Sequence, residues 1–154
     1  MRLKEPELSD ALGGDAAGGQ VGDAAVGESQ PNVGDVHAAG KDGDLLVTNV
    51  RYDVACLGWV GEIIRVNPHN GRQTIISQGD NLTYLRGITV DGDDIYVTGM
   101  ATHDQNFGRG RVTHVDARTG FQTVVAEGEN LVSPVGIAVD EDGQLIVADP
   151  YTIN

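Results

Sequence analysis

Two asparagines and an aspartate carry the side-chain oxygens with which this chain could hold a metal ion. Asn81 and Asn130 occur in the phrases GDNL and GENL, and Asp149 follows the apolar run LIVA. Oxygens of this kind are the ligands that Ca²⁺ prefers, so calcium is the cofactor that such a site would take. Asn81 and Asn130 also recur at one position of a repeat, which is typical of an Asn side chain that bonds to the backbone of a turn. Both interpretations stay open, and the residues alone identify no cofactor.

Aromatic and polar residues gather in three stretches between apolar runs. They are Tyr52 and Trp59 in VRYDVACLGWVG, Tyr84 in GDNLTYLR, and His103, Asp104 and Phe107 in MATHDQNFGRG. Long loops on a rigid scaffold are where binding groups usually reside. We therefore predict that these residues form a shallow surface for a small-molecule ligand or a protein partner. The alternative is that the aromatic rings fill the space between neighbouring sheets.

Composition and motifs exclude several classes of function. The chain has 154 residues and a formal net charge of -13, with 10 basic against 23 acidic residues. Nucleic-acid binding needs clustered Lys and Arg, so we expect no nucleic-acid partner. No GxSxG motif, P-loop or dinucleotide fingerprint is present, which favours a non-catalytic protein.

Targeting signals and long apolar runs indicate where a protein resides. MRLKEPELSD is followed by no apolar h-region, and no run of 18 apolar residues occurs, so we expect neither a secretory signal nor a spanning helix. A soluble, cytoplasmic protein is the default expectation. A secreted or periplasmic protein is the alternative if the chain is a piece of a longer one.

A repeat with a spacing of 49 residues organises the chain. GRQTIISQGDNLTYLRGITVD (71–91) and GFQTVVAEGENLVSPVGIAVD (120–140) share 10 of 21 residues without a gap. The similarity extends to GEIIRVNPHNG and GRVTHVDARTG upstream, and DGDLLVTN is a third, partial copy. Self-similarity at such a period indicates an array of structural units.

Each unit consists of short runs rich in Ile, Val and Thr, separated by Gly, Asp and Asn, which is the pattern of strands joined by turns. We predict strands near 33–38, 44–49, 61–67, 72–77, 86–91, 94–99, 110–116, 121–127, 135–140 and 144–149. The intervening segments 50–61, 79–86, 100–110 and 128–135 are predicted loops that share one face. The fold class is therefore all-β, with four-stranded antiparallel units and almost no helix.

The phrases GITVDGDDIYVTG and SPVGIAVDEDGQLIVAD, together with the period, resemble the NHL-repeat and gluconolactonase-like β-propeller family. This resemblance implies propeller blades over residues 41–154, and a divalent metal in a central channel held by Glu, Asn and Asp. Residues 1–40, rich in Gly, Ala and Asp, are predicted to be poorly ordered or a degenerate blade start. About two and a half blades are present, whereas propellers need four to eight. The missing blades would come from a longer chain or from self-association.

Two functions follow as expectations. The first is a non-catalytic β-propeller scaffold that binds a ligand or a protein partner through its loop-bearing face. The second is a portion of a metal-dependent lactonase-like or lyase-like propeller enzyme. The first is favoured because no catalytic constellation can be identified in the sequence.

Overall fold

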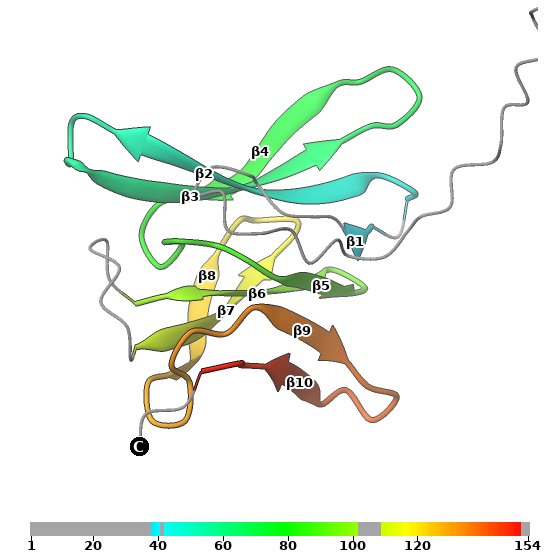
Figure 1. Ribbon diagram of the computed structural model, residues 1–154. Helices are drawn as coiled ribbons and strands as arrows, with labels where there is room; N and C mark the ends of the chain where they lie inside the picture. Colours follow the sequence, from blue (N-terminus) through cyan, green and yellow to red (C-terminus); the bar gives the residue numbers. More distant parts are fainter. Residues whose placement is uncertain (1–37, 41, 102–108, 152–154) are drawn as a thin grey trace, which may run out of the picture.

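The computed structural model describes residues 38–40, 42–101 and 109–151, and they form three antiparallel sheets stacked face to face (Figure 1). Unit 1 contains β1 (Ala38–Ala39), β2 (Leu45–Asp53), β3 (Gly58–Val66) and β4 (Gln73–Gln78). Unit 2 contains β5 (Ile88–Asp91), β6 (Asp94–Met100), β7 (Gly110–Asp116) and β8 (Gln122–Glu127). Unit 3 is the hairpin of β9 (Gly136–Val139) and β10 (Leu145–Ala148). Within each unit the strands follow chain order, and their first strands, β1, β5 and β9, are neighbours.

The predicted all-β class and the four-stranded antiparallel units are confirmed. No helix occurs within the described ranges, and so none there could span a membrane. The three sheets are separate from one another, and none of them closes on itself. Successive units therefore stack on one another, and the described sheets form no closed ring.

The turns between the third and fourth strands of units 1 and 2 have the same hydrogen bonds, as the sequence repeat predicts. In unit 1, the Asn67 side chain accepts the backbone N–H groups of His69 and Asn70. In unit 2, Asp116 accepts those of Arg118 and Thr119 in the same way. Gly71 and Gly120 then take left-handed φ values of 71° and 75°, which glycine adopts without steric cost. Turns with the same hydrogen-bond pattern therefore join the third and fourth strands in both units.

The core lies between units 1 and 2. Leu46 and Ile63 project from unit 1, and the loop between the units adds Leu82 and Leu85. Ile95, Val97 and Val115 of unit 2 complete this buried cluster. Alternation along each strand therefore places one apolar face of unit 1 against one apolar face of unit 2.

Two backbone hydrogen bonds, which we call a clasp, hold each loop that joins two units. In the first clasp, the Gly61 N–H donates to the Leu82 carbonyl at 2.8 Å, and the Gly61 carbonyl accepts the Gly79 N–H at 3.0 Å. The second clasp repeats both bonds with Gly110, Leu131 and Gly128. A Cβ on Gly61 would overlap Leu85 and the Leu82 carbonyl. Glycine is therefore required there for the close approach of the loop.

The predicted loop over 50–61 is wrong. β2 continues to Asp53 and β3 begins at Gly58, so only residues 54–57 form the turn. A cross-strand ladder persists to the end of this hairpin, where Tyr52 lies opposite Trp59 and Asp53 opposite Gly58. The predicted loops over 79–86 and 128–135 do lie between strands. Most of the predicted strand 33–38 and of the predicted loop 100–110 lies outside the described residues.

Candidate functional site

The hairpin of β2 and β3 brings three of the predicted binding residues together. The Tyr52 and Trp59 rings meet edge to face, with centroids 5.4 Å apart. The Trp59 ring also contacts Tyr84 of the loop between units 1 and 2, at 6.2 Å. We call Tyr52, Trp59 and Tyr84 the aromatic cluster. It joins the end of unit 1 to the loop that leads into unit 2, as expected if the two segments share a face.

Large apolar side chains are exposed to solvent at the tip of this hairpin. Val54 is 78% exposed and Leu57 77% exposed, and Tyr52 beside them is half-exposed. Trp59 and Tyr84 are partly buried. The Trp59 and Tyr84 rings therefore cover the junction between the units, as one sequence-based interpretation expected. The Tyr52 ring extends into solvent beside the tip, where it is available for binding, as the other expected. We call Val54 and Leu57 together with the aromatic cluster the hairpin surface.

The backbone beneath the cluster is held in an uncommon conformation. Tyr84 has a φ of 45° and Leu57 a φ of 53°, values that bulky L-residues rarely adopt. The neighbouring Thr83 is anchored, because its hydroxyl donates to the Met100 carbonyl and its own carbonyl accepts the Met100 N–H. Such conformations persist where the surroundings enforce them, and they concentrate at functional positions.

Charges on the other side of the hairpin are paired with one another. The Arg51 guanidinium donates to both Glu62 and Asp53, and the Asn49 amide also donates to Glu62. The pKa of Arg51 is raised, first by the hydrogen bond to Glu62 and then by the bond to Asp53. The pKa of Asp53 is lowered, first by the Ala55 N–H and then by Arg51. These contacts brace the hairpin up to its last residues.

The remaining predicted binding residues, His103, Asp104 and Phe107, lie outside the described residues. Their role stays a prediction. The described ends of their segment, Met100 and Gly110, lie opposite each other at the ends of β6 and β7.

The three predicted metal ligands take up different contacts. Asp149 accepts the backbone N–H groups of Val132, Ser133 and Tyr151 at 2.7 to 3.2 Å. Asn81 engages its neighbours through its backbone, since its N–H donates to Gln122 and its carbonyl accepts from Arg111. Asn130 is exposed. No group of three or more His, Cys, Asp or Glu within the described ranges could hold a metal ion. A calcium site made by these residues stays a prediction.

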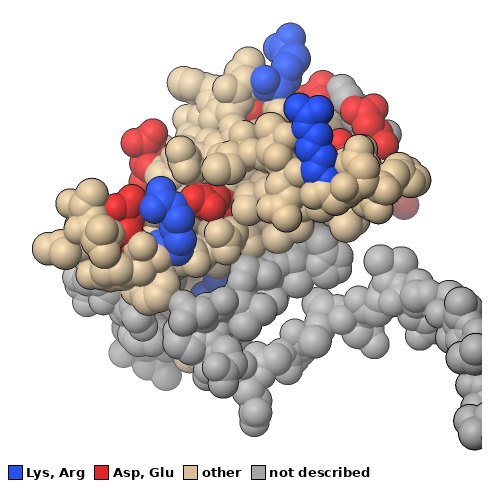
Figure 2. Space-filling model, turned by 90° about the horizontal axis from the view of Figure 1, so that it is seen from above, with Lys and Arg blue, Asp and Glu red and all other residues tan. Residues whose placement is uncertain are grey.

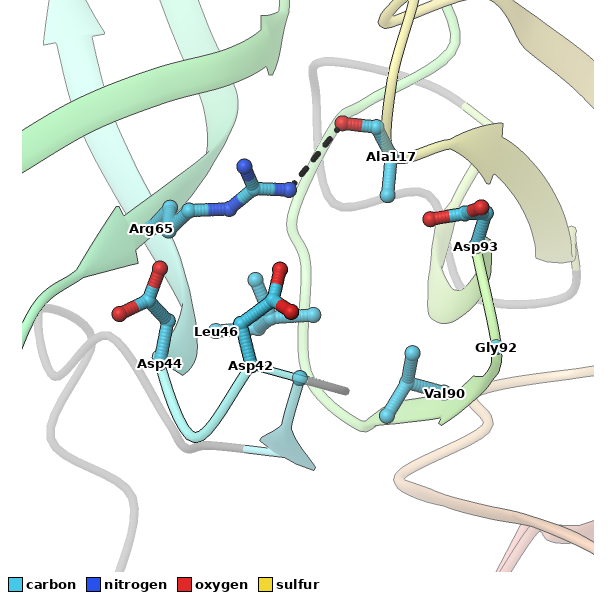
Figure 3. Close-up of a pocket in the computed structure, with 9 residues that line it drawn as sticks. Asp42, Asp44, Leu46, Arg65, Val90, Gly92, Asp93 and Ala117 are labelled. Carbon is cyan, nitrogen blue, oxygen red and sulfur yellow. Dashed lines mark hydrogen bonds between the residues drawn. The ribbon is translucent and has the colours of Figure 1, made fainter.

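A hollow lies between units 1 and 2 at the opposite end of β2, beside the turns. Figure 3 shows Arg65 reaching across it, and its guanidinium donates to the Ala117 carbonyl at 3.3 Å. The other lining residues are Gly40, Asp42, Asp44, Leu46, Val90, Gly92 and Asp93. We interpret this hollow as a gap in the packing that Arg65 spans, which fastens a strand of unit 1 to a turn of unit 2.

Sequence reasoning missed the exposed tip residues Val54 and Leu57, and it missed the bracing by Arg51. A usable signal was the alternation of polar and apolar residues along TNVRYDV, which continues the strand beyond Asn49. The composition of the segment, with Gly, Asp and Cys, concealed this pattern.

Comparisons with known proteins add no assignment for this arrangement. No protein-family model, no curated protein and no solved structure matches the chain.

Proposed function

We propose that this chain is a β-propeller-type repeat scaffold that binds a protein partner, without catalysis, through the hairpin surface. Three stacked units of the repeat support the scaffold part of the proposal, because successive blades of a propeller pack in this manner. The binding part rests on one observation above all: Val54, Leu57 and Tyr52 are exposed together at the end of a braced hairpin.

The shape of the surface favours a protein partner over a small molecule. Small ligands bind in concave sites that enclose most of their surface, whereas Val54 and Leu57 are exposed at the tip of the hairpin. The tip itself projects from the stack of sheets (Figure 1). Tyr and Trp are enriched among the residues that contribute most of the energy of protein interfaces. A braced strand pair that exposes Tyr52 beside Val54 and Leu57 is suited to enter a groove or lie against an apolar patch of another protein.

The charge of the chain restricts the partner further. With a formal net charge of -13, long-range repulsion slows the approach of an acidic protein and favours a neutral or basic one. Association with a basic partner should therefore slow as salt is added. Dissociation, which depends on the apolar contacts, should change much less.

Two side chains of the hairpin can report on binding at the hairpin surface. Trp59 is the only tryptophan and Cys56, exposed in the turn of the hairpin, is the only cysteine. Peptides selected from a random phage-displayed library against the wild-type chain should shift the Trp59 emission. They should also protect Cys56 from a maleimide.

The variants Tyr52→Ser and Leu57→Ser should each weaken binding of such a peptide by about tenfold or more, as expected for central interface residues. Val125→Ser is the matched control, because Val125 is a half-exposed apolar residue on β8 of unit 2. If the selected peptides bind the two hairpin variants as tightly as the wild type, the proposal is wrong.

A further inference from the structure

Among the described residues, the stack has one apolar face at each end that no other unit covers. The first, which we call the front face, is the side of unit 1 turned away from unit 2. It is formed by the residues that alternate with the core residues of β2 and β3, and by one residue of β4: Leu45, Val47, Ile64, Val66 and Ile75. Figure 2 views this side of the molecule from above, and the described surface over the unit 1 strands is mostly uncharged.

The front face has a buried counterpart inside the molecule. Register pairs Leu45 with Val66, Val47 with Ile64, and Ile64 with Ile75 in unit 1. The same three pairings in unit 2 involve Ile95, Val97, Thr113, Val115 and Val124. Three of them, Ile95, Val97 and Val115, belong to the buried cluster between units 1 and 2. Leu45 is 37% exposed, whereas its counterpart Ile95 is 0% exposed. The front face therefore has the pattern of a surface that another unit covers.

The other open face, which we call the back face, is the side of unit 3 turned away from unit 2. It consists of Ala138, Ile146 and Ala148, all exposed. In unit 1 the positions equivalent to Ile146 and Ala148 are Leu46 and Thr48. Leu46 is only 2% exposed because unit 2 covers it, whereas Ile146 is 58% exposed. The back face therefore has the pattern of a surface on which a following unit packs.

We propose that the back face of one copy of this chain packs on the front face of a second copy, in the geometry that already joins unit 1 to unit 2. The occupant is a second copy because the front and back faces are the two halves of an interface that the chain forms within itself. The contact is heterologous, since it joins two different surfaces, so it produces rings if the rotation closes and open chains of molecules if it does not. This proposal does not depend on the function of the hairpin surface.

Two variants test the proposal without disturbing the core. Ile75→Asp places a charge on the front face and Ile146→Asp places one on the back face, and both positions are more than half-exposed. In sedimentation equilibrium, the wild-type mass should rise with concentration up to about 1 mM, the range of a weak interface. Each variant alone should stay monomeric, because a buried unpaired charge opposes association strongly. An equimolar mixture should form a one-to-one dimer and nothing larger, since each variant keeps one intact face.

Phe121→Asp is the matched control, because Phe121 is an exposed apolar residue in a turn outside both faces. It should associate like the wild type, and far-UV circular dichroism should show the same β-signal in all four proteins. A wild type that stays monomeric up to the same concentration overturns the proposal, and the two faces then have another occupant. Association of Ile146→Asp with itself also overturns it, because that result indicates a symmetric contact through the front face alone.

Discussion

Gly71 and Gly120 occupy the same turn position in units 1 and 2, but their surroundings differ. A Cβ on Gly71 would meet nothing within 4 Å, whereas a Cβ on Gly120 would collide with the Ile76 carbonyl of unit 1. Both have positive φ, so alanine should cost about 1 kcal/mol at either position. Gly120→Ala should cost about 1–3 kcal/mol more, because it also overpacks the contact between the units. Urea unfolding of the two variants measures this difference, and equal losses would contradict the contact.

The ion pair between Arg111 and Glu127 should make stability dependent on pH. The guanidinium donates to the Glu127 carboxylate at 2.7 Å, and this bond, more than any other contact, lowers the pKa of Glu127. A carboxyl group with a lowered pKa in the folded state adds stability above its unfolded pKa, about 4.3. That stability is lost as pH falls through the lowered value. Thermal melting between pH 3 and 7 should show a steeper acid-side loss for wild type than for Glu127→Gln. Parallel curves would show that the pair contributes nothing.

One side chain adds to the backbone clasp that holds the loop between units 2 and 3. Asp149, just after β10, accepts the N–H groups of Val132 and Ser133. Asp149→Ala removes both bonds from a buried stretch and should destabilise the fold by about 1–3 kcal/mol. Hydrogen exchange should show faster exchange of the Val132 and Ser133 amides. Asp142→Ala, in the exposed turn of the same hairpin, should leave both rates unchanged. Unchanged protection in Asp149→Ala would indicate that the loop is held by its clasp alone.

Most of the described strands could be predicted from the sequence because the repeat constrains each of them twice. Residues such as Gly71 and Gly120, or Asn67 and Asp116, mark equivalent turns even where the apolar pattern is weak. The hairpin from Arg51 to Val60 could not be predicted in this way, because it has no close copy in the chain. Its strands are extended by side-chain contacts across the hairpin, such as Arg51 with Glu62 and Tyr52 with Trp59. Grouping Tyr52, Trp59 and Tyr84 on one face was predictable, but the exposed tip beside them was not.

At the scale of the whole molecule, units 1 and 2 should unfold together. They share one buried cluster that includes Leu46 and Ile63 on one side and Ile95 and Val115 on the other. Neither sheet buries this face without its neighbour, so we expect one cooperative transition. Urea unfolding followed by Trp59 fluorescence, which reports on unit 1, should coincide with unfolding followed by far-UV circular dichroism. Ile95→Ala should lower both midpoints equally, at a cost of about 2–5 kcal/mol. Two separate transitions would show that the sheets are independently stable.

The backbone clasp has a consequence for how such a molecule can change over generations. Gly61, Gly79 and Leu82, which make the first clasp, all lie within one repeat length, as do Gly110, Gly128 and Leu131 of the second. A duplication of one such stretch of DNA therefore copies the whole joint together with the strands on either side of it. New units can be added to a chain of this kind, or removed from it, as complete cassettes. The tip of the β2–β3 hairpin, residues 54–57, makes none of the clasp bonds, so it is free to acquire new lengths and side chains without disturbing the stack.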